Sequence, residues 1–258
     1  MNLHLQEKII IVSGGAKGIG EGIATLLAKE GAIPVIIGRD ENDNNKLVAS
    51  LQGKGLKAGQ VVAELSDPLQ CENAIKNIAA TYGRIDGLIN NAGVNDSVNL
   101  ENGNYEKFIS SLQKNVVHYY LLAHHALPYL KMSKGSIVNI GSKVAETGQG
   151  ATSGYAAANG ARNSLTREWA VELLQYEIRV NAVIVAECYT PLYEKWIQTL
   201  PNPNEKLAQI QAKIPLGKRF TTTEEIANTV AFLLSSVSSH TTGQLVYVDG
   251  GYTHLDKP

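Results

Sequence analysis

A tyrosine and an asparagine stand four residues apart in the stretch GYAAANGARN, residues 154–163. In a helix Tyr155 and Asn159 would share one face, with Cβ atoms roughly 5–6 Å apart. A phenol can pass a proton to or from a substrate, but its ordinary pKa of about 10 makes it a poor base at neutral pH without a nearby positive charge. Asn159 carries no charge. Either Tyr155 is structural, or the chemistry is arranged differently.

A second candidate for chemistry is the glycine-rich stretch SGGAKGIG, residues 13–20. Gly14 and Gly18 allow a sharp backbone turn close to a ligand, and Gly20 allows a helix to pack against a sheet. The N–H groups at the start of that helix would face a diphosphate. Such glycines alone are often only a turn, but an apolar run before them and a helical pattern after them favour a dinucleotide site.

Charge near the end of the second apolar run bears on which dinucleotide binds. Arg39 follows Gly38, and an arginine there offers a fork of donors for a 2′-phosphate. Lys17 adds positive charge from the glycine-rich loop. Asp40 could instead turn inward and accept hydrogen bonds from a free ribose. The residues favour NADP over NAD, with NAD left open and with a merely solvated Arg39 as the structural alternative.

Short apolar runs alternate with longer amphipathic segments along the chain. Successive apolar residues within a run need cover on both faces, which is typical of a parallel sheet between helices. We therefore expect an α/β fold, a doubly wound (Rossmann) parallel sheet of about seven strands with helices on both faces. The expected strands are 8–13, 33–38, 59–64, 86–90, 135–142, 179–185 and 244–250. The expected helices are 18–30, 41–52, 68–82, 104–131, 153–176 and 223–236.

No linker or repeat divides the sequence, so residues 1–258 are expected to form one dinucleotide-binding domain. Binding sites in such folds lie at the carboxyl ends of the strands. The long connection at about 186–217 carries two short helical patterns, at 193–200 and 204–214. It is expected to overhang that edge as a substrate lid.

Composition narrows the partners. The chain has 44% hydrophobic and 18% charged residues and a formal net charge of -1, without a basic run. We expect no nucleic-acid partner, no membrane partner and no metal. The start of the chain lacks the pattern of a signal peptide, and no apolar stretch reaches membrane-spanning length. Cys71 and Cys188 are expected to be free thiols in the cytoplasm, although one disulfide stays possible.

Further motifs follow the glycine-rich loop in series: NNAG at 90–93, Asn115 after a lysine, Ser142 after the fifth expected strand, and Tyr155 thirteen residues later. Over essentially the whole chain this series resembles the short-chain dehydrogenase/reductase family. Ser13 replaces the usual threonine, and Glu64 a common aspartate. The resemblance implies a cofactor site formed by Ser13, Gly14, Lys17, Gly18, Ile19, Gly20, Arg39, Glu64, Leu65, Asn91, Ala92, Gly93, Tyr155, Asn159 and Thr190.

The resemblance also implies roles in catalysis. Tyr155 would exchange the hydroxyl proton, Ser142 would hold the substrate oxygen, and Asn115 would anchor a water. The family has a lysine where this chain has Asn159, and that lysine holds the nicotinamide ribose and favours the ionised phenol. Three explanations stay open: the cationic oxidised nicotinamide suffices, Lys143 swings in, or the protein binds dinucleotide and sugar without turnover.

Several loops resemble the sugar dehydrogenase branch, in particular L-fucose dehydrogenases, which form a lactone. They read AETGQGATSGYAA, LTREWAVEL, NAVIVAECYTPLYEKWI, PLGKRFTTTEEIA and SHTTGQLVYVDGGYTHLD. The lid reads Val185-Ala186 where many members have Pro-Gly. Polar candidates for the substrate side are Glu146, Gln149, Glu187, Tyr252 and His254. The alternative within the class is reduction of a 3-oxoacyl thioester or another carbonyl.

The resemblance further implies a homotetramer. Two long helical segments, 104–131 and 153–176, carry more apolar residues than one sheet face needs. We expect helices from neighbouring subunits to pair through side chains such as Tyr119, Leu122, Leu165 and Trp169.

Overall fold

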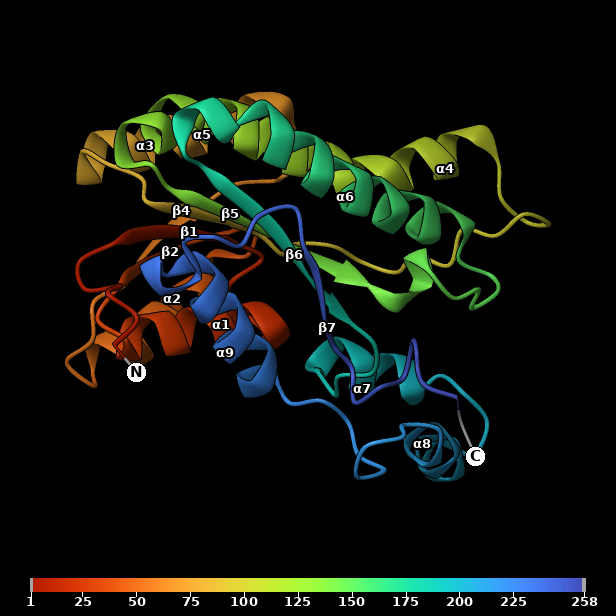
Figure 1. Cartoon of the computed structure of the whole chain (residues 1–258). Coiled ribbons are helices and arrows are strands. Elements are labelled where there is room, and N and C mark those ends of the chain that lie inside the picture. Colours follow the sequence, from red (N-terminus) through yellow and green to blue (C-terminus); the bar gives the residue numbers. More distant parts are fainter. Residues whose placement is uncertain (1, 257–258) are drawn as a thin grey trace.

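A parallel seven-stranded sheet runs through the computed structural model, which describes residues 2–256 (Figure 1). The strand order is β3-β2-β1-β4-β5-β6-β7, so the chain winds outward in two directions from β1 and β4. This confirms the doubly wound α/β fold expected from the sequence. The strands are β1 (Ile9–Ser13), β2 (Ile33–Gly38), β3 (Gly59–Val62), β4 (Gly87–Asn90), β5 (Ser136–Ser142), β6 (Arg179–Val185) and β7 (Leu245–Val248).

Helices cover both faces of the sheet. In Figure 1, α3, α5 and α6 lie above it, and α1, α2 and α9 lie below it. Successive residues of a strand point to opposite faces. Accordingly, Ile10 and Val12 of β1 join the cluster with α1 and α9, whereas Ile9 and Ile11 join the cluster with α3, α5 and α6. The helices are α1 (Gly18–Lys29), α2 (Glu41–Gln52), α3 (Pro68–Tyr82), α4 (Tyr105–Leu112), α5 (His118–Ser133), α6 (Ser153–Glu172), α7 (Pro191–Ile197), α8 (Pro203–Ala212) and α9 (Thr223–Leu234).

The long helix expected at 104–131 is interrupted. Between α4 and α5 the residues Gln113–Val117 form a wider π-helical turn. Asn115 lies in this turn with its side chain buried, and its Nδ2 donates to the carbonyl of Ser111 at 2.9 Å. A side chain that bonds the backbone four residues earlier competes with regular helical bonding. Turns of this kind are frequent at functional sites.

The second long segment, 153–176, is also shorter than expected. The helix α6 ends at Glu172, and a 3-10 turn covers Leu174–Tyr176. β2 and β6 have the expected bounds, and the other strands differ from them by one or two residues at an end. The apolar pattern does not show where the last ladder hydrogen bond falls.

The apolar side chains expected to pair subunits lie elsewhere. Tyr119, Leu122 and Trp169 are buried in the core against the sheet, and Leu165 packs partly buried beside them. The expectation that they form an outward surface is wrong, because α5 and α6 use these residues to cover their own sheet. The exposed apolar side chains of this layer are others, among them Tyr120, Val117, Val171 and Leu174.

The segment expected to be a lid, 186–217, follows β6 and contains α7 and α8. Each of these short helices begins with a proline, and Thr190 caps α7 by accepting a hydrogen bond from the N–H of Tyr193 at 3.2 Å. Its role as a lid stays a prediction, as does the single domain over 1–258, whose residues 1, 257 and 258 lie outside the described residues. Within residues 2–256, no helix has both the length and the apolar character needed to cross a bilayer.

Candidate active site

The glycine-rich loop joins β1 to the start of α1 in the conformation that a diphosphate cradle needs. Gly14 and Gly18 have φ of +63° and +58°, a region that favours glycine. A Cβ on Gly20 would lie 2.2 Å from the carbonyl oxygen of Gly14, so only glycine fits there. The first N–H groups of α1 are available for an anion. These residues therefore fit a dinucleotide diphosphate, with Ile19 in the first turn of α1.

The NNAG motif, residues 90–93, is tied to this loop by hydrogen bonds. The hydroxyl of Ser13 accepts from the backbone N–H of Asn91 at 2.9 Å and of Ala92 at 3.2 Å. The amide of Asn91 donates to the carbonyls of Ser13 and Gly14. The hydroxyl that Ser13 shares with the usual threonine thus binds the NNAG loop. The two loops form one rigid wall at the carboxyl edge of β1 and β4.

The expected adenosine end is exposed. Arg39 reaches the carboxylate of Glu64 at 3.5 Å, with 80% and 42% of the two side chains exposed. Hydrogen bonds from Ser66, and the Arg39 charge nearby, hold the pKa of Glu64 below its usual value. Leu65 is buried directly after it. Asp40 caps α2 by accepting from the N–H of Asp43 at 3.0 Å, which ties one of its oxygens to the helix.

Lys17 forms an ion pair with Asp43 in the first turn of α2. Thr190 lies on the far side of the glycine-rich loop, because a Cβ on Gly18 would come within 3.3 Å of it. The glycine-rich loop therefore lies next to the start of the expected lid.

Two of the expected catalytic residues, Asn115 and Asn159, are fully buried and share one neighbour. The guanidinium of Arg162 donates from Nε to the carbonyl of Asn115 at 2.7 Å and from Nη1 to Oδ1 of Asn159 at 3.0 Å. The amide of Asn159 also donates to the carbonyl of Tyr155 at 2.9 Å. Arg162 was not foreseen from the sequence, although its place seven residues after Tyr155 puts it on the same helix face.

Tyr155 and Ser142 are half-buried at the carboxyl edge. Tyr155 stands in the first turn of α6, and Ser142 ends β5, where its hydroxyl is within 3.5 Å of the N–H of Val144. Their roles in proton transfer stay predictions. Asn115 also holds the loop after the NNAG motif, since its Oδ1 accepts from the N–H of Val94 at 2.7 Å.

Three groups meet on the expected substrate side. The ammonium of Lys143 forms an ion pair with Glu187, and their side chains are only 9% and 13% exposed. The same ammonium lies 3.8 Å from the centre of the Tyr252 ring. Lys143 is thus engaged with the start of the lid and the tail, in agreement with the expectation that a neighbour of Ser142 tends to point away from it.

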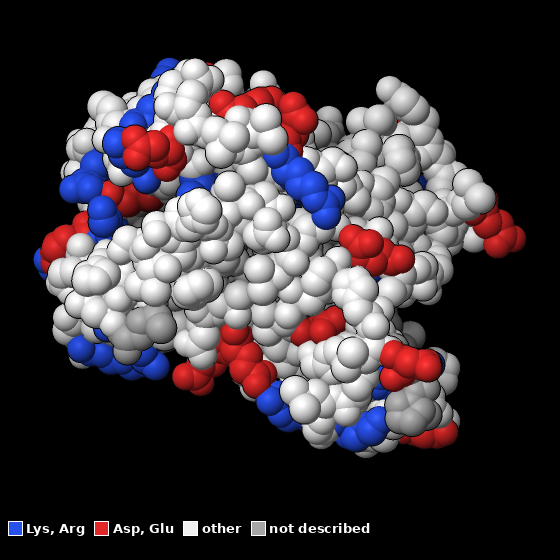
Figure 2. Space-filling model, viewed as in Figure 1, with Lys and Arg blue, Asp and Glu red and all other residues white. Residues whose placement is uncertain are grey.

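The other substrate candidates are more exposed. Glu146 accepts a hydrogen bond from the amide of Asn163 at 3.0 Å, and His254 packs edge-on against Tyr247 with ring centres 4.3 Å apart. Gln149 lies exposed in the loop before α6. Figure 2 shows the surface hollowed between the part that carries α4 and the part that carries α7 and α8.

Three aromatic rings of the expected lid pack together with Phe220, which follows the lid in sequence. Tyr193 lies within 5.9 Å, ring centre to ring centre, of Tyr189, Trp196 and Phe220. Burial raises the pKa of the Tyr193 hydroxyl, and the nearby Glu187 carboxylate adds to that effect. Tyr193 therefore stays a neutral phenol beside the charged pair.

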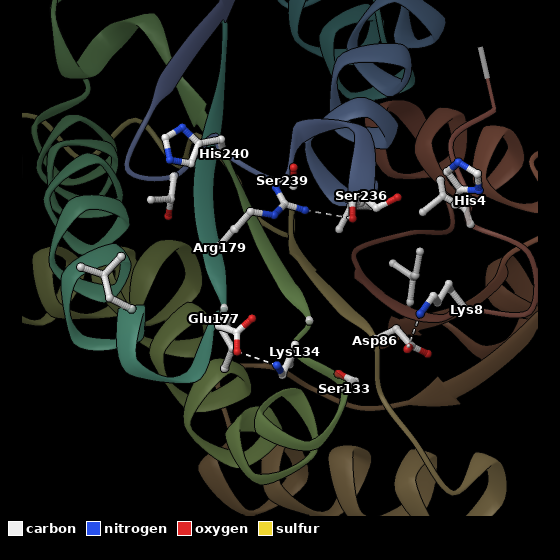
Figure 3. Close-up of a pocket in the computed structure, with 17 residues that line it drawn as sticks. His4, Lys8, Asp86, Ser133, Lys134, Glu177, Arg179, Ser236, Ser239 and His240 are labelled. Carbon is white, nitrogen blue, oxygen red and sulfur yellow. Dashed lines mark hydrogen bonds and ion pairs between the residues drawn. The ribbon is translucent and has the colours of Figure 1, made fainter.

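A cavity of about 590 Å³ lies at the opposite edge of the sheet (Figure 3). It is lined by residues at the amino ends of β4, β5 and β6, including Lys8, Asp86, Lys134, Glu177 and Arg179. Their charged groups are engaged: Asp86 holds the start of β1 through the N–H of Ile9 at 2.9 Å, Lys134 pairs with Glu177, and Arg179 donates to carbonyls at the end of α9. The polar groups here stabilise the sheet, and ligands of such folds bind at the other edge.

Both cysteines are free and buried, and burial raises the pKa of Cys71 to about 11 and of Cys188 to about 12. The expectation of free thiols is confirmed. Among residues 2–256, no three His, Cys, Asp or Glu side chains gather into a group that could hold a metal ion.

The doubly wound sheet, the glycine-rich cradle and the phenol on the neighbouring helix together define a dinucleotide-dependent oxidoreductase. A family model described as enoyl-(acyl carrier protein) reductase matches residues 14–253. The chain belongs to the short-chain dehydrogenase/reductase family and is an NAD(P)-dependent dehydrogenase/reductase.

Relatives support this assignment. The 3-oxoacyl-[acyl-carrier-protein] reductase of Thermotoga maritima is 35% identical over 96% of this chain and 99% of its own. The L-fucose dehydrogenase of Oryctolagus cuniculus is 31% identical over 95% of this chain and 84% of its own. The crystal structure of Cj0485 dehydrogenase is 47% identical, with a TM-score of 0.93 over 99% of this chain and 98% of that one. These relatives are named as enzymes, which favours turnover over silent binding.

Proposed function

We propose that the protein oxidises a hydroxyl of a small sugar, an L-fucose-like aldose, to a lactone with NADP. The observation that carries this proposal is the buried pair of Lys143 and Glu187 beside the ring of Tyr252. The L-fucose dehydrogenase of Oryctolagus cuniculus and the sugar dehydrogenase loops support the same substrate class.

A sugar suits this cluster chemically. Its hydroxyl groups need charged or polar partners, and its C–H face can pack on an aromatic ring. An acyl chain would leave the charged pair desolvated without new partners, which is costly. Glu146 and Gln149, and Tyr252 and His254 in the tail, add polar groups around the same edge.

The proton path is proposed as follows. Tyr155 accepts the proton of the sugar hydroxyl, Ser142 hydrogen-bonds the same oxygen, and Asn115 anchors a water that leads the proton to solvent. Bound in the glycine-rich cradle, the nicotinamide cofactor would accept the hydride from the oxidised carbon. Asn159 is proposed to face the ribose.

NADP is proposed over NAD because Arg39 and Lys17 are exposed and bound only to surface carboxylates, from which a 2′-phosphate can draw them. The cytoplasm is the proposed location, since its reducing conditions suit two free thiols. A homotetramer is also proposed, through exposed apolar side chains of the α5 and α6 layer such as Val171 and Leu174. Light scattering that finds a monomer at micromolar concentration would contradict it.

A substrate screen tests the proposed activity. L-fucose, other aldoses and 3-oxoacyl thioesters are each offered with both cofactors, and the absorbance of the reduced nicotinamide is followed. The result expected is oxidation of an aldose with lactone as product. Reduction of a 3-oxoacyl thioester without aldose oxidation would overturn the proposal in favour of the activity named for the Thermotoga maritima relative.

A matched pair of variants tests whether the buried pair of Lys143 and Glu187 lies in the substrate site. Glu187→Gln removes the buried carboxylate, and Glu194→Gln removes an exposed carboxylate from α7 of the same lid. KM for the sugar should rise at least about tenfold in the first variant and stay unchanged in the second. Equal values of KM in the two variants would remove Glu187 from the substrate site.

A further inference from the structure

Arg162 is a buried cation without a carboxylate partner. Only 3% of the residue is exposed, and its recorded acceptors are the carbonyls of Asn115 and Ile140 and the amide oxygen of Asn159. Within residues 2–256, no carboxylate oxygen lies within 4.0 Å of its guanidinium nitrogens. Burying a charge without an opposite charge costs several kcal/mol. A side chain kept under those conditions calls for a reason beyond packing.

One end of the guanidinium is left open. Its Nη2 is fully buried and has no hydrogen-bond partner within residues 2–256. A Cβ on Gly93 would lie 2.7 Å from Nη2, so this nitrogen sits directly beneath the NNAG loop, in space that any larger residue would fill. The charge is therefore held at the carboxyl edge of the sheet rather than at the outer surface of α6.

Two phenols flank this charge. Tyr155, Asn159 and Arg162 follow the i, i+4, i+7 spacing of one helix face. The guanidinium carbon lies 5.9 Å from the centre of the Tyr155 ring and 4.3 Å from that of Tyr119. We propose that Arg162 is the fixed positive charge that favours the ionised form of Tyr155, acting through the phenol as a positioning residue without touching the substrate. This inference rests on the proton-transfer role proposed for Tyr155.

The other neighbours of Arg162 do not compete for this role. Burial raises the pKa of Tyr119, so that phenol stays protonated. His118 lies against Tyr119, and burial, with the Arg162 charge, lowers its pKa to about 4, so its ring is neutral near pH 7.

Charged groups on the surrounding elements are already engaged. Lys143 pairs with Glu187. Glu146 accepts from Asn163, and Asp96 accepts from the hydroxyl of Ser111 at 2.7 Å. Arg162 is thus the cation in ring contact with Tyr155 among the described residues. An opposite charge nearby favours the ionised form of an acid.

Two substitutions at one position separate charge from shape. Arg162→Gln and Arg162→Lys both lose the guanidinium fork, but only the first loses the charge. We expect the acid limb of the pH–rate profile for oxidation to move up by about one pH unit in Arg162→Gln and to stay within a few tenths of wild type in Arg162→Lys. A purely structural role would impair both alike. Coincident profiles for wild type and Arg162→Gln would overturn the proposal, as would equal displacement in both variants.

A second readout needs neither cofactor nor substrate. The ultraviolet difference spectrum between each protein and the same protein with Tyr155→Phe reports ionisation of this one phenol during a pH titration. Its midpoint should rise by about one unit in Arg162→Gln and not in Arg162→Lys. An unchanged midpoint in Arg162→Gln would refute the inference. Because no sugar is present, this result stands apart from the outcome of the substrate screen.

The charge can also be moved. Adding Asn159→Lys to Arg162→Gln places a cation one turn nearer to Tyr155, and the double variant should recover the wild-type midpoint or fall below it. Asn159→Lys alone would bury two cations together and should lower the melting temperature. If Arg162→Gln does not fold, the double variant and Arg162→Lys carry the test, since both retain one charge. A midpoint more than a few tenths above the wild-type value in both variants would overturn the proposal.

Discussion

Two arginines on opposite edges of the sheet are held in different ways. Arg179 begins β6 at the amino edge, and its two terminal nitrogens donate to the carbonyls of Leu233, Leu234 and Ser235 and to the hydroxyl of Ser238. Arg162 lies beneath the carboxyl edge with one terminal nitrogen unsatisfied and two phenol rings for neighbours. The first set of acceptors ends α9, where the helix dipole concentrates negative partial charge.

The amino edge of the sheet, where Arg179 lies, is the edge whose polar groups serve stability. Every terminal donor of Arg179 is used, so the residue ties α9 to β6 and has nothing left for a ligand. Arg162 combines burial, an unpaired charge and a free donor, a costly arrangement of the kind that persists where function needs it. Substitutions at the two edges should therefore separate stability from turnover.

The largest effect is expected from Tyr155→Phe at the carboxyl edge. Loss of a positioned acid–base group lowers kcat by about 10²–10⁴-fold. Cofactor affinity and melting temperature should stay close to wild type, because the ring is kept and the lost hydroxyl belongs to a half-buried side chain. Tyr120→Phe, which removes a hydroxyl from an exposed ring on α5, serves as the control. Undiminished turnover after Tyr155→Phe would remove this phenol from the mechanism.

The opposite behaviour is expected from Arg179→Met at the amino edge. The carbonyls that end α9 lose their charged donor, and the free energy of unfolding should fall by about 3 kcal/mol, while kcat per folded molecule is unchanged. Urea unfolding and active-site titration measure the two quantities. Arg167→Met, on the exposed face of α6, should leave both within error. A fall in kcat with stability intact would reverse the assignment of the two edges.

Much of this fold follows from simple patterns. The apolar runs of β1, β2, β5 and β6 are buried on both faces, so alternation with amphipathic segments was enough to predict a parallel sheet. The π-helical turn at Asn115 had no such signal, because it depends on a side chain that bonds Ser111 and on a tertiary contact with Val94. The face of α5 that meets the sheet was not predicted for a different reason: apolar residues surround that helix.

The candidate site likewise contains parts that the local sequence predicts and parts that it does not. The glycine-rich loop and the NNAG loop depend on local backbone geometry, which glycine and asparagine indicate in the sequence. The neighbours of Lys143 and Arg162 come from segments far apart in the chain, such as Glu187 and Asn115, and only the folded sheet edge brings them together. An amide at position 159 pointed to a missing charge without revealing that one lay a single turn further along α6.

A third expected effect is a pH dependence of stability that arises from buried His118, beside Arg162. Burial, with the nearby guanidinium, lowers the pKa of His118 from 6.5 to about 4. Between these values the unfolded chain binds the proton and the folded chain does not. This contribution to stability is therefore complete above about pH 6.5, declines as the pH falls and levels off below about pH 4. Its full size is about 3 kcal/mol.

The variant His118→Gln isolates this contribution. A glutamine amide can replace the ring N–H that donates to the carbonyl of Lys114 at 3.0 Å, and it does not titrate. Urea unfolding of both proteins from pH 7 to pH 4 should show the wild type losing stability relative to the variant as the pH drops. Parallel curves would mean that the ring already carries its proton in the folded state.

The smallest effect is expected from substitution of Arg39, a solvent-exposed arginine, and concerns the preference for NADP over NAD. Arg39 is 80% exposed, and its contact with Glu64 at 3.5 Å is of a kind worth about 0–1 kcal/mol. A 2′-phosphate offers two oxygens and a full charge to the same fork, so it should displace that carboxylate and favour NADP over NAD by about 1–2 kcal/mol. Arg39→Ala should reduce the preference to about twofold. Arg219→Ala, at a second exposed arginine that pairs with Glu225 in the first turn of α9, should leave it intact. Calorimetric titration of each protein with both cofactors measures the difference. Equal affinities in the wild type, or tighter NAD, would indicate that Asp40 uses its remaining oxygen for the ribose in spite of its bond to the N–H of Asp43.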